Sequence, residues 1–247
     1  MNHFSAPEIE LLAQGGARLR RVLDSVAALV HPGVTGTQLN AAAEQLIQEL
    51  GAKPAFKGYG QPPYPNALCV SINDCVVHGI ATDQTLKEGD IVSLDCGIEY
   101  QGFFTDAAIT VPVGAITTEA AKLIATARQA LELAIKTAKA GITTGDLGAV
   151  VQAYIEQQGL AVVRDYTGHG VGRRVHDDPP VPNYGKPGHG VTITEGMVIA
   201  IEPMVTAGSW KVDVTDNHWD VITVDGSLAA HFEHTVAITQ DGCRVLT

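Results

Sequence analysis

The chain has 247 residues, 45% of them hydrophobic and 17% charged, and its formal net charge at pH 7 is −11. These values are typical of a globular protein with one large core, and no apolar run approaches the roughly 18 residues of a membrane span. The acidic balance argues against a nucleic-acid surface, which needs clustered Lys and Arg, but not against cation binding. Because the N-terminus lacks a secretory pattern and the four cysteines lack CxxC spacing, we expect a cytoplasmic protein with reduced thiols.

The first predicted element is a helix near the N-terminus. Ser5 and Glu8, with Pro7 between them, have the form of a capping box that opens a helix running towards Val30. Farther along, the sequence predicts a helix at roughly residues 118–139 and Pro/Gly-rich loops at residues 53–66 and 178–190.

Two segments of the chain occur twice. GVTGTQL at residues 33–39 matches GITTGDL at residues 141–147, and EGDIVSLD at residues 88–95 matches EGMVIAIE at residues 195–202, at offsets of 108 and 107. In each copy an amphipathic helix follows the first motif and ends at a glycine, Gly51 or Gly159. We therefore expect a single domain, residues 1–247, made of duplicated halves at about residues 1–113 and 114–247, with the chemistry on a pseudo-two-fold axis.

The repeated strand ends in a carboxylate, Asp95 in the first copy and Glu202 in the second. Ile91–Cys96 and Phe103–Val111 have the pattern of a strand hairpin. A turn centred between residues 100 and 101 would put Asp95 opposite Asp106, about 5 Å away at Cβ, where like charges destabilise the pair. A protonated carboxyl, a turn-capping Asp or a cation between the two groups would each relieve this repulsion.

Further metal-binding side chains follow in the second half. Glu233 lies in the apolar run HFEHTVAIT, and His169 and His176 flank a Gly-rich segment just upstream of the second carboxylate strand. Four carboxylates in apolar strands need compensation, and carboxylate oxygens with an imidazole suit Mn, Fe, Co or Zn. Because four carboxylates carry more charge than one divalent ion balances, we predict two divalent ions in a hydrolytic site.

These residues carry a resemblance to a known family. In their order, Asp95, Asp106, His169, Glu202 and Glu233 resemble the five-ligand dinuclear site of the methionine aminopeptidases, and the resemblance covers nearly the whole chain, from HPGVTGTQL through NDCVVHGI and GHGVGRRVHDDPPVPNYG to FEHTVAIT. The short interval between the last two ligands is similar to that of the type I enzymes. The resemblance implies an α+β pita-bread fold, in which an antiparallel sheet covered by helices divides into two pseudo-two-fold related halves.

The resemblance also implies a role for each matching residue. Asp95, Asp106, His169, Glu202 and Glu233 would bind metal, Asp106 and Glu233 would bridge the two ions, and Glu202 would also shuttle a proton. His78 would lie near the substrate amide, and His176 would polarise the scissile carbonyl. The residues at or near the methionine pocket would be Tyr59, Tyr64, Cys69 and Trp219, although ordinary packing explains each of these four about equally well.

The sequence departs from the family pattern at three places. The segment GYGQPPYPNALC is longer and richer in proline than usual, which affects the assignment of Tyr59. Val175 replaces the aromatic residue common before the second histidine, so we expect a wider pocket there. His231 stands where the family usually has Gln and is expected to alter the surroundings of Glu233.

The activity implied by the resemblance is removal of the initiator Met from nascent proteins when the second residue is small, by metal-activated hydroxide attacking the first peptide bond. The alternatives are an Xaa-Pro aminopeptidase or prolidase, which normally has an added N-terminal domain, and a non-catalytic pita-bread binding protein, which loses metal ligands. We expect a monomer that acts on peptide N-termini, with no nucleic-acid or membrane partner. A transient contact with the ribosome stays an open alternative. Lys211 is the only Lys or Arg between Ser209 and Asp225, so we expect no basic docking patch in that segment.

Overall fold

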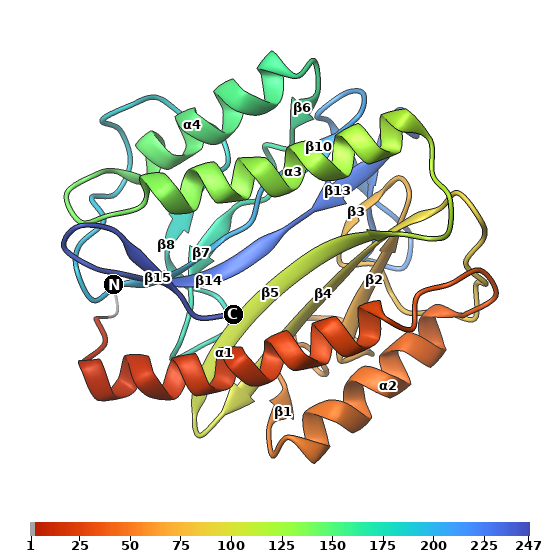
Figure 1. Cartoon of the computed structure of the whole chain (residues 1–247), viewed down its shortest axis with the longest axis horizontal. Helices are drawn as coiled ribbons and strands as arrows, with labels where there is room; N and C mark the ends of the chain where they lie inside the picture. Colours follow the sequence, from red (N-terminus) through yellow and green to blue (C-terminus); the bar gives the residue numbers. More distant parts are fainter. Residues whose placement is uncertain (1–2) are drawn as a thin grey trace.

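A nine-stranded antiparallel sheet forms the centre of the computed structural model, which describes residues 3–247. The strands of this sheet are β1 (Lys53–Pro54), β2 (Leu68–Ile72), β4 (Ile91–Tyr100), β5 (Phe103–Pro112), β7 (Gly168–Gly170), β8 (Asp177–Val181), β9 (Val198–Ile201), β14 (Glu233–Ile238) and β15 (Cys243–Val245). Their order is β1-β4-β5-β14-β9-β7-β8, and in addition β2 pairs with β4 and β15 with β14. The pairing of β5 with β14 joins the two halves of the chain in the middle of the sheet (Figure 1).

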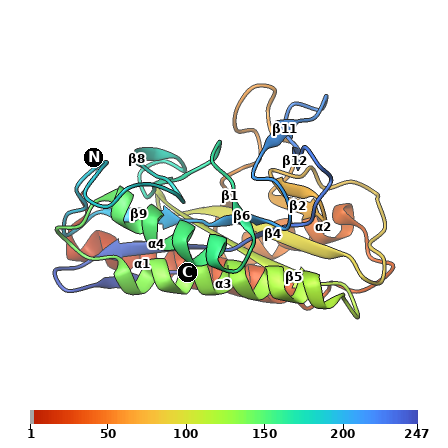
Figure 2. The ribbon, with the colours of Figure 1, turned by 90° about the horizontal axis from the view of Figure 1, so that it is seen from above.

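Helices pack along one side of this sheet (Figures 1 and 2). They are α1 (Ala6–Ala27), α2 (Gly36–Glu49), α3 (Thr118–Thr137) and α4 (Thr144–Gln157). The buried faces of α1 and α2 form one apolar core with strands of the first half, and those of α3 and α4 form another with strands of the second half. The core therefore lies between the helices and the sheet, which leaves the other face of the sheet for the site.

The helix ends agree with the sequence prediction to within a few residues. The Ser5 N–H donates to the Glu8 carboxylate at 2.8 Å, as a capping box requires. α1 ends at Ala27 rather than near Val30, because the chain has to leave the helical conformation before Pro32. A glycine with positive φ lies just beyond α2 and just beyond α4, as predicted.

Equivalent positions of the two sequence repeats adopt the same local structure. Thr35 and Thr143 are the N-caps of α2 and α4, and both form capping boxes. Each also makes an isolated β-bridge, Thr35 to Thr85 and Thr143 to Thr192. These pairs are offset by 108 and 107 residues, the same offsets as in the sequence repeat.

The register of the β4–β5 hairpin differs from the prediction. The turn consists of Gln101 and Gly102, both with positive φ, so that Asp95 lies opposite Ala108 rather than opposite Asp106. A two-residue hairpin turn with positive φ at both positions favours glycine, which explains why the turn includes Gly102. Because the register shifts by two residues, an even number, Asp95 and Asp106 still face the same side of the sheet as diagonal neighbours.

Both predicted loops contain a short strand, so the loop prediction is wrong at their starts. Lys53–Pro54 form β1 at one edge of the sheet, and Asp177–Val181 form β8 at the other. Pro179 and Pro180 have no N–H to donate, and an edge strand tolerates this because only one of its sides is paired.

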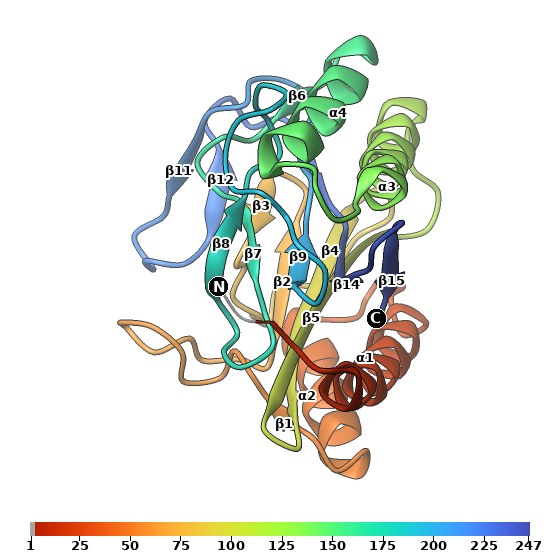
Figure 3. The same cartoon turned by 90° about the vertical axis from the view of Figure 1, so that its left-hand side faces the viewer.

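Two three-stranded sheets adjoin the main sheet. One contains β6 (Ala161–Val162), β10 (Met204–Thr206) and β13 (Ala229–His231); the other contains β3 (Cys75–Val77), β11 (Val212–Val214) and β12 (Val221–Thr223). The sheet that contains β6, β10 and β13 packs against α3 and α4. Figure 3 shows β11 and β12 projecting on the side away from α1 and α3. Within residues 3–247, no helix is both long enough and apolar enough to cross a membrane.

Candidate active site

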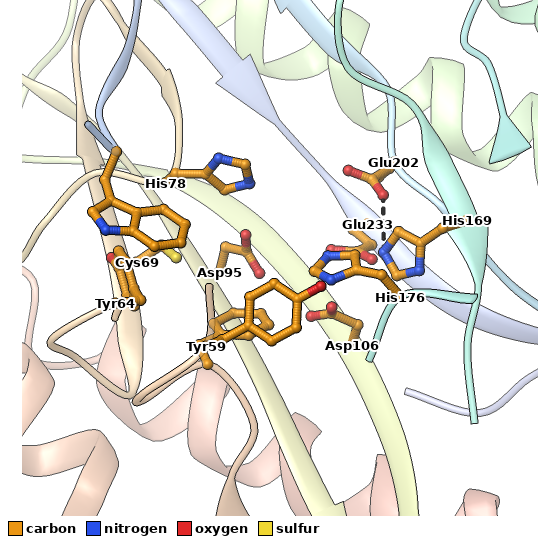
Figure 4. A pocket seen from close by; sticks show the side chains of 12 residues that line it. Tyr59, Tyr64, Cys69, His78, Asp95, Asp106, His169, His176, Glu202 and Glu233 are labelled. Carbon is orange, nitrogen blue, oxygen red and sulfur yellow. Dashed lines mark ion pairs between the residues drawn. The ribbon is translucent and has the colours of Figure 1, made fainter. Parts of the chain in front are cut away.

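Three carboxylates meet around Ala108, a small residue in the middle of β5. Ala108 pairs with Asp95 of β4 on one side and with Glu233 of β14 on the other. Asp106 lies two positions earlier in β5, opposite Gly97, and therefore faces the same side. Ligand oxygens of Asp95, Asp106 and Glu233 all lie within 4.8 Å of one another (Figure 4). The register of three neighbouring strands thus gathers carboxylates that are far apart in the sequence.

The fourth carboxylate, Glu202, directly follows β9 and faces His169 of β7. Its Oε1 lies 3.3 Å from the His169 Nε2 (Figure 4). The His169 Nδ1–H donates to the Gly170 carbonyl at 2.9 Å, so the neutral ring turns an Nε2 lone pair towards Glu202. Lone pairs facing each other at this distance repel unless a cation or a proton lies between them. His169, Glu202 and Glu233 form a second group whose ligand atoms all lie within 4.8 Å.

The electrostatics of this cluster favour a bound cation. Burial raises the pKa of Asp106 to about 7, and burial with mutual repulsion raises the pKa values of Asp95, Glu202 and Glu233 well above their usual range. Within residues 3–247, Asp95 Oδ1, Asp106 Oδ1 and Glu233 Oε1 are buried without a hydrogen-bond partner. Burial also lowers the pKa of His169 to about 4, which keeps its imidazole neutral. Carboxylate oxygens and a neutral imidazole fit a divalent metal.

His78 and His176 approach the carboxylates from outside the main sheet. His78 directly follows β3 with a φ of +61°, a conformation uncommon for a residue other than glycine, and burial lowers its pKa to about 4. The His176 ring lies 4.4 Å from the His169 ring and 5.0 Å from the Tyr59 ring, centroid to centroid, and burial lowers its pKa. Ligand atoms of His176, His169 and Asp106 also lie within 4.8 Å of one another, so the geometry permits His176 either role, ligand or catalyst.

All the site residues predicted from the sequence surround one cavity of about 190 Å³. Its lining consists of Phe56, Tyr59, Tyr64, Cys69, His78, Asp95, Asp106, His169, His176, Glu202, Trp219 and Glu233. None of these is Lys or Arg, so no basic side chain of the cavity wall offsets the carboxylates. Figure 4 shows Asp106, Glu202, Glu233 and His169 at one end, Tyr64 and Cys69 at the other, and Asp95 and His78 between them.

The sequence prediction missed two residues of the site. Phe56 lines the cavity and packs in one buried cluster with Tyr64, Cys69 and Val175. Asn183, which is buried, donates from Nδ2 to the Glu202 carbonyl at 2.9 Å. Both lie in Pro/Gly-rich segments without periodicity, where only the residue type, an aromatic or an amide among loop residues, could have drawn attention to them.

Comparison with known proteins decides the family. Residues 10–240 match the family model of the metallopeptidase family M24. The chain belongs to this family. Membership implies the use of a divalent metal, in agreement with the carboxylate and histidine cluster, and supports a hydrolase, so the non-catalytic alternative has less support.

Similar proteins narrow the assignment within the M24 family. The chain is 46% identical over 241 residues to the methionine aminopeptidase of Clostridium perfringens, covering 97% of this chain and 96% of that protein. The crystal structure of the methionine aminopeptidase from Thermotoga maritima superimposes with a TM-score of 0.97 at 44% identity, over 100% of this chain and 99% of that one. The resemblance to the methionine aminopeptidases and the α+β pita-bread fold are therefore confirmed.

The prolidase alternative has less support. The prolidase of Pyrococcus furiosus superimposes with a TM-score of 0.81 at 24% identity, over 99% of this chain but only 65% of that one. This likeness shows the shared fold alone, and about a third of the prolidase chain has no counterpart here.

Proposed function

We propose that this protein is a methionine aminopeptidase that removes the N-terminal Met from peptides and nascent proteins when the second residue is small. The observation that carries the proposal is the gathering of four buried carboxylates and three histidines around one cavity, in a chain nearly half identical to a methionine aminopeptidase.

The metal site is proposed to hold two divalent ions, Co, Mn, Fe or Zn, with Asp95, Asp106, His169, Glu202 and Glu233 as ligands. Two overlapping groups of ligand atoms support two ions, because Glu233 belongs both to the group with Asp95 and Asp106 and to the group with His169 and Glu202. When bound, the ions would polarise the substrate carbonyl and lower the pKa of water. The carboxylates would then be ionised, because a nearby cation counteracts the effect of burial.

The side chains around the ions are proposed to orient the substrate and move protons. Glu202 would accept a proton from the attacking water and pass it to the leaving amine. Burial keeps His78 and His176 neutral at pH 7, so that each can donate a single N–H. His176 would donate to the scissile carbonyl and His78 would lie against the substrate amide.

The apolar end of the cavity is proposed to bind the side chain of the first residue. Tyr64 and Trp219 meet edge to face with ring centroids 5.0 Å apart, and Cys69 and Tyr59 complete the lining. Sulfur in a methionine side chain interacts favourably with aromatic ring edges, which this arrangement offers.

The setting of the reaction is proposed as well. The substrate would be the N-terminus of a newly made chain in the cytoplasm, and the enzyme would act there as a monomer with at most transient contact to the ribosome. The whole chain, with halves at about residues 1–113 and 114–247, would form the catalytic unit, since β5 of the first half and β14 of the second both bear proposed ligands.

One assay tests the proposed activity. Protein loaded separately with Mn, Fe, Co or Zn is offered Met-Ala-Ser and an Xaa-Pro peptide, and release of the first residue is measured. Cleavage of Met-Ala-Ser is expected with at least one metal. Preference for the Xaa-Pro peptide would favour the prolidase alternative, and cleavage of neither would refute both.

A further inference from the structure

His231 is a buried imidazole beside the site to which the proposed function gives no role. It is the last residue of β13 and is 1% exposed. Among residues 3–247, neither its Nδ1 nor its Nε2 has a hydrogen-bond partner. Because leaving a buried polar group unpaired destabilises the folded state, an imidazole without a partner at such a position needs an explanation.

The polar group facing this ring is the carboxylate of Glu202. The His231 Nε2 lies 3.7 Å from Glu202 Oε2, and on the other side His169 Nε2 lies 3.3 Å from Glu202 Oε1. His169 already donates its Nδ1–H to a backbone carbonyl, so its Nε2 has no proton to give. Of the two imidazoles that flank Glu202, only His231 is free to donate a hydrogen bond to it.

Hydrogen bonds hold the backbones of both His231 and Glu202 in place. The His231 N–H donates to the Thr110 hydroxyl at 2.9 Å, and that hydroxyl donates back to the His231 carbonyl at 2.8 Å. Thr110 in turn hydrogen-bonds Ser93 at 2.8 Å, and Asn183 holds the Glu202 carbonyl. With both backbones fixed, a side-chain movement of about 1 Å brings Nε2 within the usual 2.7–3.2 Å of the carboxylate oxygen.

We propose that His231 is a positioning residue that donates its Nε2–H to Glu202 Oε2 and thereby holds Oε1 towards His169 and the cation site. The inference rests on the proposed role of Glu202 as ligand and proton carrier. A carboxylate held at one oxygen cannot rotate freely about its terminal bond, so its other oxygen keeps the direction that the metal requires. Partners of this kind, which orient a ligand, typically change metal affinity or activity by about 10–100-fold when removed.

The tautomer of His231 can be measured without any activity. Long-range ¹H–¹⁵N NMR spectra of histidine-labelled protein, metal-free and zinc-loaded, distinguish Nε2–H from Nδ1–H rings, and the spectrum of His231→Gln identifies the His231 signals. A neutral ring with the proton on Nε2 in the zinc-loaded protein is expected. A proton on Nδ1 would overturn the proposal, because Nε2 would then have none to donate.

Two variants distinguish loss of the hydrogen-bond donor at position 231 from loss of side-chain packing there. His231→Leu removes the donor, whereas His231→Gln keeps an N–H at a similar reach. By calorimetry with Mn²⁺, His231→Leu should weaken binding at least tenfold and His231→Gln less than threefold, and on Met-Ala-Ser the loss for His231→Leu should fall on kcat rather than KM. His234→Leu is the matched control, because His234 hydrogen-bonds Thr247 at 3.0 Å instead of Glu202. It should bind Mn²⁺ as the parent protein does.

The outcomes distinguish this proposal from the proposed function. If the parent protein binds Mn²⁺ but cleaves no Met peptide, the proposed function fails while the tautomer and affinity measurements still decide the role of His231. Equal Mn²⁺ affinity of the His231→Leu and parent proteins would refute the positioning role, as would an equal loss in the Leu and Gln variants. Should His231→Leu fail to fold, the tautomer and the Gln variant still provide the test.

Discussion

The wall of the cavity next to Val175 is where the structure changes the expectation drawn from the sequence. Val175 stands where an aromatic residue was expected, which predicted a wider pocket. In the structure Phe56 packs in the same buried cluster and lines the cavity, and the exposed fractions of Val175 and Phe56 are 6% and 8%. An aromatic ring is therefore present, supplied by the segment after β1 rather than by the residue before His176.

Exchanging the two side chains tests this explanation. Val175→Phe adds a ring to a filled space and should destabilise the protein by about 1–3 kcal/mol. Phe56→Val removes most of a buried ring and should cost about 2–4 kcal/mol, somewhat below a Phe→Ala change. The double exchange conserves volume, so its cost should be smaller than the sum of the single costs by about 1–3 kcal/mol, as expected for residues packed in one buried cluster.

The same variants should differ in their choice of first residue. A missing ring at Phe56 gives room to branched side chains, and selection by shape in an apolar pocket amounts to about 1–3 kcal/mol per methylene-sized change. Phe56→Val should therefore reduce the preference for Met over Leu by up to roughly tenfold, or ~1.4 kcal/mol. Val175→Phe should impair both substrates alike, and the double exchange should recover part of the preference.

The assay compares kcat/KM for Met-Ala-Ser and Leu-Ala-Ser with stability in urea for each variant. Phe103→Val is the control for losing a ring elsewhere, because Phe103 packs against Phe4 at 6.2 Å between centroids and lines no part of the cavity. Phe103→Val should lower stability without changing the ratio of kcat/KM for Met-Ala-Ser to kcat/KM for Leu-Ala-Ser. If Val175→Phe alone raised the preference for Met at full stability, the space beside Val175 would be empty and the reasoning would be refuted.

Substitutions and pH changes at the carboxylate cluster should have three separable effects. Asp106→Asn should abolish tight binding of at least one ion and nearly all activity, because the proposed ligand changes from a carboxylate to a neutral amide. Retained metal by elemental analysis, together with retained peptide hydrolysis, would contradict the proposed two-ion site. His176→Ala should lower kcat by roughly 10²–10³-fold at unchanged metal content, the scale of one lost oxyanion donor. Loss of metal in that variant would make His176 a ligand. Metal-free protein should lose stability as pH rises from about 4 to 7, because burial raises the pKa of Asp106 to about 7 and the native state then binds more protons than the unfolded state. A Tm that rises with pH in the presence of a chelator would contradict this sign.

Local chemistry made much of the fold predictable. The Ser5–Glu8 capping box and the glycines after α2 and α4 act within a few residues, so their outcome depends little on the rest of the chain. The sequence repeat predicted that Thr35 and Thr143 would occupy equivalent places, and they do so down to their β-bridges. Edge strands such as β8 were missed, because Pro179 and Pro180 give a loop signal that only tertiary pairing overrides.

The gathering of the carboxylates could be predicted in spite of an incorrect register, for a geometrical reason. Side chains alternate between the faces of a strand, so the two-residue error at the Gln101–Gly102 turn left Asp95 and Asp106 on the same face. An error of one residue would have separated them. Strand alternation does not predict the wall formed by Phe56 or the contact of His231 with Glu202. Each of these depends on where a loop or a short strand packs against a distant segment. Specificity and fine positioning in this site are therefore proposed to depend on contacts that periodicity does not encode, whereas the proposed metal ligands lie on or next to strands whose alternation does encode their direction.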